Sequence, residues 1–415
     1  MSKRPVDVDY TTGAVDSAGR KSTLSMFMVM LGFTFFSASM WVGQQLAAGL
    51  DFSGFVWALL LGGAILAAYT GALGYIGAKS GLSLDMLSRR SFGSMGSYLP
   101  SAMISFTQIG WFGVGLAMFA IPVAKELLGL EVTPDHMPWQ GYLLVAIAGI
   151  LMTASAFYGI KSLTVISYIA VPAVAILGTV AMILAIRKGD MGLVAQFSQG
   201  TKDLGIIAGA GLVVGSFVSG GTATPNFTRF ARSGKVGLLT TIVAFFIGNS
   251  LMFLFGAVSS IYVGGNDIFE VMLNLNLFYL AVLVLGLNIW TTNDNALYTA
   301  GLGLSNITGQ SKKLMVFISG LIGTVAAVWL YWNFCDWLNI LNCTLPPVGI
   351  ILIISYFMNK DTFVDAPLKT VNWWAVMGVV AGAVVANLVK WGFPAINGMA
   401  VAALFYLIGV LLRKK

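Results

Sequence analysis

Leu31–Gly49 reads LGFTFFSASMWVGQQLAAG, an apolar run that Gly, Ser and Gln residues interrupt. A second run, Gly209–Arg232, reads GAGLVVGSFVSGGTATPNFTRFAR, and its core from Ser216 to Thr224 is dense in Gly, Ser and Thr. Gly costs about 1 kcal/mol relative to Ala inside a helix, and Ser and Thr compete for backbone hydrogen bonds. Although each run is about long enough to span a bilayer, neither makes a good continuous helix. The pattern predicts two broken membrane helices rather than ordinary packing through glycine.

The rest of the chain has the composition of a membrane protein. Of its 415 residues, 58% are hydrophobic and 9% are charged, whereas about a quarter of a soluble domain is charged. No linker rich in Pro, Ser or charge divides the chain, so we expect one membrane domain. Apolar runs of about 20 residues predict twelve spanning helices. These lie at 24–48, 54–78, 97–123, 140–159, 162–186, 204–224, 236–263, 277–303, 313–331, 337–357, 372–390 and 394–412.

The two interrupted runs are the first and the sixth of these spans. Five spans therefore separate equivalent positions, and an odd-numbered repeat inserts its second copy upside down. Interrupted helices at matching positions of two halves indicate a transporter with its site near the bilayer midplane, where unwound carbonyls can ligate a cation. The predicted organisation is a polar tail (1–22), a first inverted repeat (23–190), a second inverted repeat (191–358) and two further helices with a short C-terminus (359–415).

The basic residues predict the orientation. Twelve spans place both termini on one side, and 18 of the 23 Lys and Arg residues then share that side. By the positive-inside rule both termini are cytoplasmic. The net charge of +7 is spread over short loops and forms no single basic face, so we expect no nucleic-acid partner. The single histidine belongs to no Cys/His cluster, so we expect neither a zinc site nor an organic cofactor.

The third span carries a polar and aromatic stripe. Within Ser105–Phe119, SFTQIGWFGVGLAMF, the residues Gln108, Trp111 and Gly115 lie at i, i+3 and i+7 and share one helix face. A long amide beside an indole, with a small residue next to them, forms a flat slot with a hydrogen-bonding edge. We therefore expect this face to line a cavity rather than to contact lipid.

The eighth span carries a second stripe. Gly286–Gly301 reads GLNIWTTNDNALYTAG, with Asn288, Thr291, Thr292 and Asn295 on one face. Unpaired amides and hydroxyls in hydrocarbon cost several kcal/mol each, so the stripe must line a cavity or bond across helices. Two adjacent hydroxyls and a nearby carbonyl are hard ligands that suit a small cation such as sodium. Asp294 is the one carboxylate deep in a span, and either a functional or a structural hydrogen-bonding role fits it.

Four segments resemble the nucleobase–cation symporter-1 family: SASMW (37–41), RRSFGSMGS (89–97), TQIGWFGVG (107–115) and GLNIWTTNDNALY (286–298). The resemblance implies an inverted five-helix repeat of the leucine-transporter type followed by two helices, in the inner membrane of a bacterium. It also implies sodium-coupled uptake of cytosine by alternating access. Sodium is then the coupling ion, cytosine and the lipid bilayer are the partners, and we expect a monomer.

The resemblance also implies the site. The substrate ring would lie between Trp111 and Phe217, and the position of Phe217, where some relatives have a second Trp, favours one small pyrimidine ring over a hydantoin. The polar partners of the substrate would be Gln108, Ser216, Ser219, Asn288 and Asn293. The sodium ligands would be the carbonyl groups of Gly32, Phe35 and Asn288 with the hydroxyl groups of Thr291 and Thr292.

Other functions stay open at this point. The same fold could move another ring (uracil, hydantoin or allantoin) with a proton as driver and Asp294 as its carrier, and dependence of uptake on sodium at fixed pH would exclude this. A membrane-embedded transferase or hydrolase needs a nucleophile with a base or a carboxylate cluster, and Asp294 is the one carboxylate deep in a span. A channel is a further alternative, although an asymmetric stacked slot suits binding better than conduction.

Overall fold

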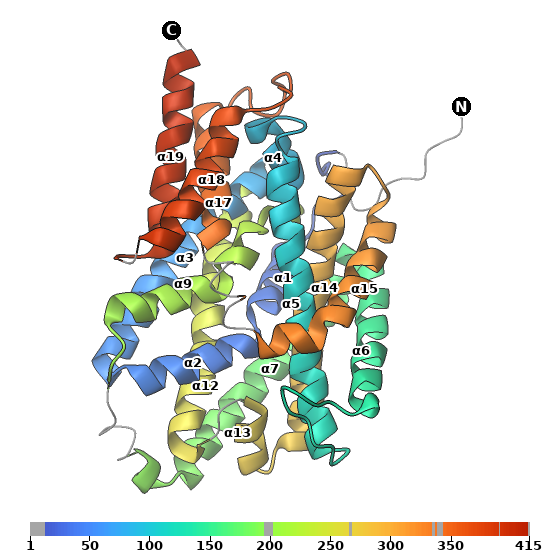
Figure 1. Cartoon of the computed structure of the whole chain (residues 1–415), viewed down its shortest axis with the longest axis vertical. Coiled ribbons are helices and arrows are strands. Elements are labelled where there is room, and N and C mark those ends of the chain that lie inside the picture. Colours follow the sequence, from blue (N-terminus) through green and yellow to red (C-terminus); the bar gives the residue numbers. More distant parts are fainter. Residues whose placement is uncertain are drawn as a thin grey trace.

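The computed structural model describes residues 13–194, 202–264, 268–333, 337, 343–389 and 391–413, and all regular elements within these ranges are helices (Figure 1). Most of the predicted tail (1–12) lies outside the described residues. So do part of the tenth span (338–342) and the basic residues Lys390, Lys414 and Lys415.

The helices follow the predicted order of spans. The first five spans are α1 (Thr23–Thr34) with α2 (Ser37–Gly49), α3 (Phe52–Ser80), α5 (Tyr98–Glu126), α6 (Trp139–Phe157) and α7 (Ile160–Lys188). The next five are α9 (Ile206–Thr222) with α10 (Pro225–Thr228), then α11 (Gly234–Ile242), η1 (Val243–Gly248) and α12 (Asn249–Val263) as one span, α14 (Phe278–Thr308), α15 (Lys312–Trp332) and α17 (Pro346–Met358). The last two are α18 (Trp373–Leu388) and α19 (Pro394–Arg413).

Not every span is apolar along its whole length. In the described part of the chain, seven helices are long and apolar enough to cross a membrane, or eight when α1 and α2 count as one bent span. Helices α9, α17 and α18 are shorter, and α14 is long but carries the polar stripe at its centre. Two short helices that the sequence did not predict, α4 (Leu84–Phe92) and α13 (Ile268–Asn274), lie in loops.

The predicted break in the first span is confirmed. Helices α1 and α2 are bent by 54° at Phe35 and Phe36, whose backbones are extended. The side chain of Asn288 bridges the break, because it donates to the carbonyl of Phe35 and accepts from the amide of Ser37 at 3.0 Å. An amide side chain thus takes the place of helical hydrogen bonds that the break removes.

The predicted interruption of the sixth span is also present, and it falls at the end of the stretch from Ser216 to Thr224. The Gly- and Ser-rich stretch from Ser216 stays helical to Thr222, and the turn falls at Ala223 and Thr224. Pro225 has no N–H, so the carbonyl of Gly221 accepts from Thr224 three residues on instead. The glycines serve packing, since a Cβ atom at Gly220 would lie 2.9 Å from the ring of Phe33.

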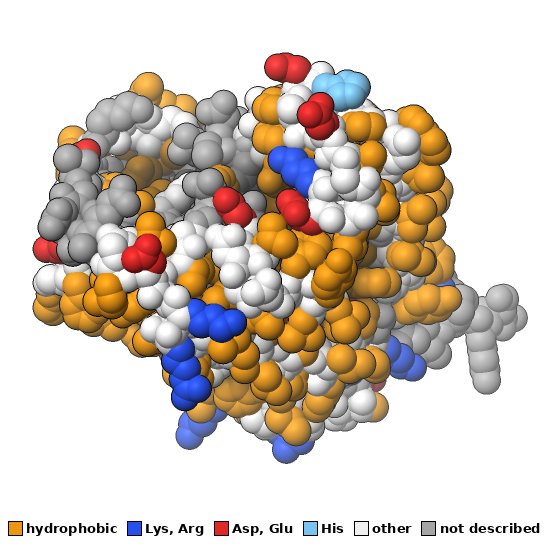
Figure 2. Space-filling view, turned by 90° about the horizontal axis from the view of Figure 1, so that it is seen from below, with side chains coloured by type: hydrophobic (Ala, Val, Ile, Leu, Met, Phe, Trp, Pro, Cys, Tyr) orange, Lys and Arg blue, Asp and Glu red, His pale blue; other side chains and the backbone are white. Residues whose placement is uncertain are grey.

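The spans form two groups with the break of the first span between them (Figure 1). In one group α3 packs along α9 and α11, and α2 packs along α12. In the other, α5 packs along α14 and α15, and α6 packs on α15. Helix α7 contacts α1, α12 and α14 and so joins the groups, while α17, α18 and α19 pack against one another at one side. Figure 2 shows the lower end of the molecule, seen from below the view of Figure 1. Acidic side chains lie on this end, and hydrophobic side chains surround much of it.

Asp85 lies in the first turn of helix α4 and is 4% exposed. The hydroxyl of Ser101 donates to one carboxyl oxygen at 2.5 Å, and the other oxygen has no partner among the described residues. Burial raises the pKa of Asp85 to about 6, against the opposing effects of that hydrogen bond and of the positive charges on Arg229 and Arg89. The folded protein therefore favours the protonated form of this carboxyl group only below about pH 6.

This raised pKa predicts a pH-dependent stability. The folded chain binds the Asp85 proton more tightly than the unfolded chain, whose carboxyl has a pKa of 3.8. The ionised form therefore costs about 3 kcal/mol above pH 6, and this cost shrinks as pH falls through about 6 toward 4. We expect Asp85→Asn to raise the melting temperature of the detergent-purified protein at about pH 8 and to change it little at about pH 4.5. Equal gains at both pH values would contradict the raised pKa.

Candidate transport site

A cavity lies where the break of the first span faces α5, α9 and α14. The space that atoms leave unfilled there, including its open mouth, is about 270 Å³. Its lining consists of Phe33, Phe36, Gln108, Trp111, Ser216, Phe217, Ser219, Gly220, Thr292 and Ala296. Five of the predicted substrate residues and one predicted sodium ligand are thus brought to one cavity from three separate spans, α5, α9 and α14.

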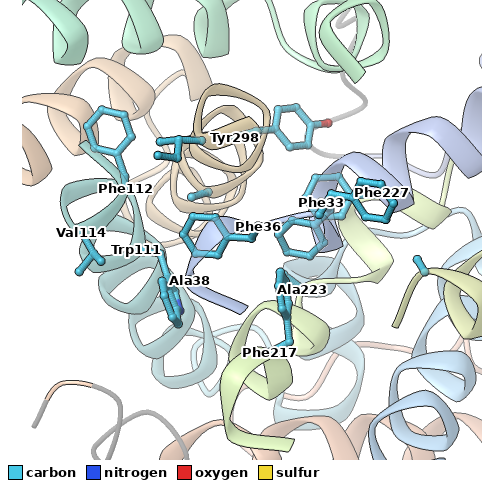
Figure 3. Packing of buried hydrophobic residues seen from close by; sticks show 14 of the residues in the cluster. Phe33, Phe36, Ala38, Trp111, Phe112, Val114, Phe217, Ala223, Phe227 and Tyr298 are labelled. Carbon is cyan, nitrogen blue, oxygen red and sulfur yellow. The ribbon is translucent and has the colours of Figure 1, made fainter. Parts of the chain in front are cut away.

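Aromatic rings form much of the cavity wall (Figure 3). Trp111 from α5 and Phe217 from α9, the two predicted stacking residues, are 7% and 5% exposed. Each is met by a ring from the first span. Phe36 packs edge-on against Trp111 with ring centroids 5.7 Å apart, and Phe33 packs edge-on against Phe217 at 5.4 Å. The wall is therefore fixed by contacts between the broken first span and the other helices.

Polar groups on the same wall are mostly held in place. The indole N–H of Trp111 donates to the hydroxyl of Ser219 at 3.0 Å, and the hydroxyl of Ser216 donates to the carbonyl of Val213 at 2.8 Å. Gln108 is the exception. Its side chain is 1% exposed, and its amide nitrogen has no partner among the described residues. Because a buried, unpaired amide is costly, Gln108 offers a donor to whatever enters the cavity.

The five predicted sodium ligands lie together beside this cavity. The hydroxyl of Thr291 donates to the carbonyl groups of Gly32 at 3.1 Å and of Asn288 at 2.7 Å. The hydroxyl of Thr292 donates to the same Asn288 carbonyl at 3.3 Å. The fifth group, the carbonyl of Phe35, is held by the side chain of Asn288. All five groups are neutral, hard oxygen ligands, which suit a small monovalent cation.

Two predicted substrate residues do not line the cavity. The side chain of Asn288 is engaged with the break of the first span, as described above. The amide of Asn293 points toward α5 and α6, where it donates to the carbonyl of Phe112 at 3.2 Å and to the sulfur of Met152. On a helix, neighbouring residues point in different directions, so the polar cluster of the eighth span serves several neighbours at once.

Asp294 lies on another side of α14. It is fully buried and accepts from the hydroxyl of Ser155 on α6 at 2.6 Å, and Ser155 in turn accepts from the indole of Trp290 at 2.6 Å. Its second carboxyl oxygen has no partner among the described residues. The carboxylate is therefore part of the contact between α14 and α6, and it is not among the residues that line the cavity.

Four lining residues were not predicted from the sequence: Phe33, Phe36, Gly220 and Ala296. Phe33 and Phe36 were hidden because aromatic residues in an apolar span are ordinary. Their position on either side of the break was the available signal, since a broken helix turns its flanking side chains toward the cavity it opens.

The chain matches known proteins along nearly its whole length. Residues 14–409 match the family model described as permease for cytosine/purines, uracil, thiamine, allantoin. The cytosine permease of Escherichia coli strain K12 is 47% identical over 406 residues, which cover 97% of this chain and 94% of that protein. The hydantoin permease of Microbacterium maritypicum is 22% identical over 366 residues, which cover 79% and 73% of the two chains.

Solved structures show the same fold. A nucleobase-cation-symport-1 family transporter, in a closed conformation with bromovinylhydantoin bound, superposes with a TM-score of 0.80 at 17% identity over 96% of this chain and 94% of that one. A Na+-coupled sialic acid symporter gives a TM-score of 0.74 at 13% identity over 99% and 93%. The predicted fold class of an inverted-repeat transporter is therefore confirmed. Because residues 14–409 match this family model and a cytosine permease is 47% identical over 97% of the chain, the chain belongs to the family of permeases for cytosine/purines, uracil, thiamine and allantoin.

Proposed function

We propose that this nucleobase permease imports cytosine together with sodium, one ion for each substrate molecule, by alternating access. The main support for this proposal is that Thr292 takes part in two neighbouring sites. Its hydroxyl contacts the carbonyl of Asn288 within the cluster of predicted sodium ligands, and its side chain also lines the cavity. One residue thus belongs to both sites, so that filling one site affects the other.

The cavity suits a small, neutral, planar ring. A base stacked on an aromatic side chain gains about 1–3 kcal/mol, and Trp111 and Phe217 both border the cavity. Gln108 supplies an amide whose nitrogen is unpaired, and an amide can match the donor and acceptor edge of cytosine. None of the lining residues is charged, so a charged nucleotide would enter unpaired at a large cost.

Sodium would supply the driving force for accumulation. An inward sodium gradient of about tenfold and a membrane potential of about 100 mV together provide roughly 3.7 kcal/mol for each ion, enough for about several-hundredfold accumulation of a neutral substrate. The bent first span contributes the carbonyl groups of Gly32 and Phe35 to the cluster of predicted sodium ligands. The same span contributes the rings of Phe33 and Phe36 to the cavity. We therefore expect this span to couple the two sites during the change of access.

The test is uptake of radiolabelled cytosine into proteoliposomes with and without an inward sodium gradient, at equal pH on both sides. We expect uptake that requires the gradient and that unlabelled cytosine suppresses. Uptake that does not depend on the sodium gradient but is driven by an imposed proton gradient would overturn sodium as the coupling ion. Uptake of another ring in preference to cytosine would overturn the choice of substrate.

Asp294 provides a separate prediction about the driving ion. Its carboxyl accepts from Ser155 and is absent from the cavity lining, and an Asn side chain can accept the same hydrogen bond. We expect Asp294→Asn to keep sodium-dependent cytosine uptake at most of the wild-type rate. Ser155→Ala serves as the control for damage to the contact between α14 and α6. A variant that folds normally but no longer responds to any ion gradient would indicate that Asp294 carries the coupling proton.

A further inference from the structure

A second cavity lies between α4, the end of α17, α19 and the loop from 359 to 372, and it shares no lining residue with the transport site. The space that atoms leave unfilled there, including its open mouth, is about 600 Å³. In Figure 1 these elements lie together at the upper end of the molecule, where α19 ends. This is the end that the positive-inside rule assigns to the cytoplasm.

The cavity is built by a close fit between two loops. The amide groups of Ser94 and Met95 donate to the carbonyl groups of Lys369 and Thr370 at 2.8 and 2.9 Å. Gly93 has a φ of +97°, and a Cβ atom at this residue would lie 2.7 Å from the carbonyl oxygen of Thr370, so only Gly fits. On the other side, the side chain of Asn372 donates to the carbonyl of Ser91 at 2.8 Å. The walls are therefore held in place by the backbone.

The lining is polar and basic. It includes Arg90, Lys369 and the hydroxyl or amide side chains of Ser91, Ser355, Asn359, Thr362, Asn372 and Tyr406, and it includes no acidic residue. Asp361 and Asp365 belong to the same loop but are exposed and stand outside the lining. Two positive charges that meet around hydrogen-bond donors form a recess for an anion.

Two side chains in this recess keep hydrogen-bonding capacity that the described residues do not use. Ser91 is 2% exposed, and its hydroxyl has no partner among the described residues. Arg90 is half-buried and donates to the carbonyl of Ala366 at 2.5 Å, which uses one of its five N–H groups. A buried hydroxyl without a partner costs free energy. An anion that accepts from Ser91 and Arg90 would remove this cost.

Exposed apolar side chains flank lining residues of the recess along the chain. Phe357, Met358, Leu368 and Trp373 are 50%, 45%, 46% and 64% exposed, and they flank the lining residues Asn359, Lys369 and Asn372 along the chain. Hydrophobic and aromatic residues at the boundary of a spanning helix contact acyl chains and headgroups. Basic pockets between spanning helices on the cytoplasmic side bind anionic headgroups.

We propose that this recess binds the phosphate of an anionic phospholipid from the cytoplasmic leaflet, with Arg90, Lys369 and Ser91 as its ligands and the exposed apolar residues beside its acyl chains. A soluble phosphate ion shares the headgroup chemistry but does not use the apolar border. The bound lipid would tie α4 to α17 and α19.

The test measures the melting temperature of the full-length protein, delipidated in detergent, after addition of phosphatidylglycerol, phosphatidylcholine or inorganic phosphate. A ligand present at about a hundred times its dissociation constant should raise the melting temperature of a chain of this size by about 3 °C. We expect this shift with phosphatidylglycerol alone and its loss in the double variant Arg90→Gln, Lys369→Gln. The control double variant Lys79→Gln, Lys235→Gln removes two exposed charges from the same end and should keep the shift.

Two further variants distinguish a loss of lipid binding from a loss of folding. Arg90→Lys keeps the charge and should keep most of the shift, whereas Ser91→Ala keeps the fold and should reduce it. If both double variants lose the shift equally, the effect comes from general surface charge, and if both keep it, Arg90 and Lys369 do not bind the lipid. Either result would overturn the site. A full shift with inorganic phosphate would overturn the lipid as its source, and a full shift with phosphatidylcholine would overturn the selection for an anion.

Discussion

The double variant Thr291→Ala, Thr292→Ala is expected to lose sodium stimulation of cytosine uptake. In the structure both hydroxyl groups contact the carbonyl of Asn288, and Thr291 also contacts that of Gly32. A contact to a charged group contributes about 1.5–3 kcal/mol, so each lost ligand should weaken sodium binding by roughly tenfold to a hundredfold. The measurement is the sodium concentration that gives half-maximal uptake into proteoliposomes, which should move beyond the accessible range.

The matched controls keep the helix and change the ligands. Thr291→Ser and Thr292→Ser retain the hydroxyl groups and should keep sodium stimulation. Thr308→Ala removes an exposed hydroxyl at the end of the same helix and should behave like wild type. If the double alanine variant keeps the sodium response of wild type, the ligands of the driving ion lie elsewhere.

Trp111→Ala is expected to weaken cytosine binding by about a hundredfold, since a stacked base gains about 1–3 kcal/mol from one aromatic side chain. The variant also removes the edge contact with Phe36 and the hydrogen bond to Ser219, so the cavity loses its shape as well as a stacking surface. Direct binding of radiolabelled cytosine to the purified protein at saturating sodium measures the loss and separates binding from transport.

Two variants bracket this effect. Trp111→Phe keeps a ring and should bind cytosine more tightly than Trp111→Ala, although it lacks the N–H that reaches Ser219. Trp329→Ala removes an indole that is 66% exposed on α15 and should leave binding unchanged. Wild-type affinity in a folded Trp111→Ala protein would place the substrate outside this cavity.

The polar stripe of the eighth span shows how far sequence reasoning reaches. Asn288, Thr291 and Thr292 stand out because amides and hydroxyls are costly in a membrane helix. Helical periodicity then places them on one face, and the structure brings them to the break of the first span. Periodicity could not decide which neighbour each side chain meets. Asn293 reaches α5 and α6, and Asp294 reaches Ser155 on α6.

The break in the sixth span shows the opposite limit. Intrinsic preference predicted a break in the run with its core from Ser216 to Thr224, but most of that core stays helical, to Thr222, because small residues allow close packing against Phe33 and Thr70. Tertiary contacts overrode a preference of about 1 kcal/mol per residue. The helix ends before Pro225, because Pro has no N–H with which to continue the helical hydrogen bonds.

From the sequence alone we predicted about twelve membrane spans, a broken first span, and polar stripes on the third and eighth spans that contribute residues to one cavity. These properties follow from local chemistry: the low charge, the length of the apolar runs and the cost of unpaired polar groups in lipid. Only the tertiary structure decided that Phe33 and Phe36 complete the cavity, that Asn288 bridges the break and that a basic recess forms around Arg90 and Lys369. Those features depend on contacts between helices far apart in the chain, which no local pattern encodes.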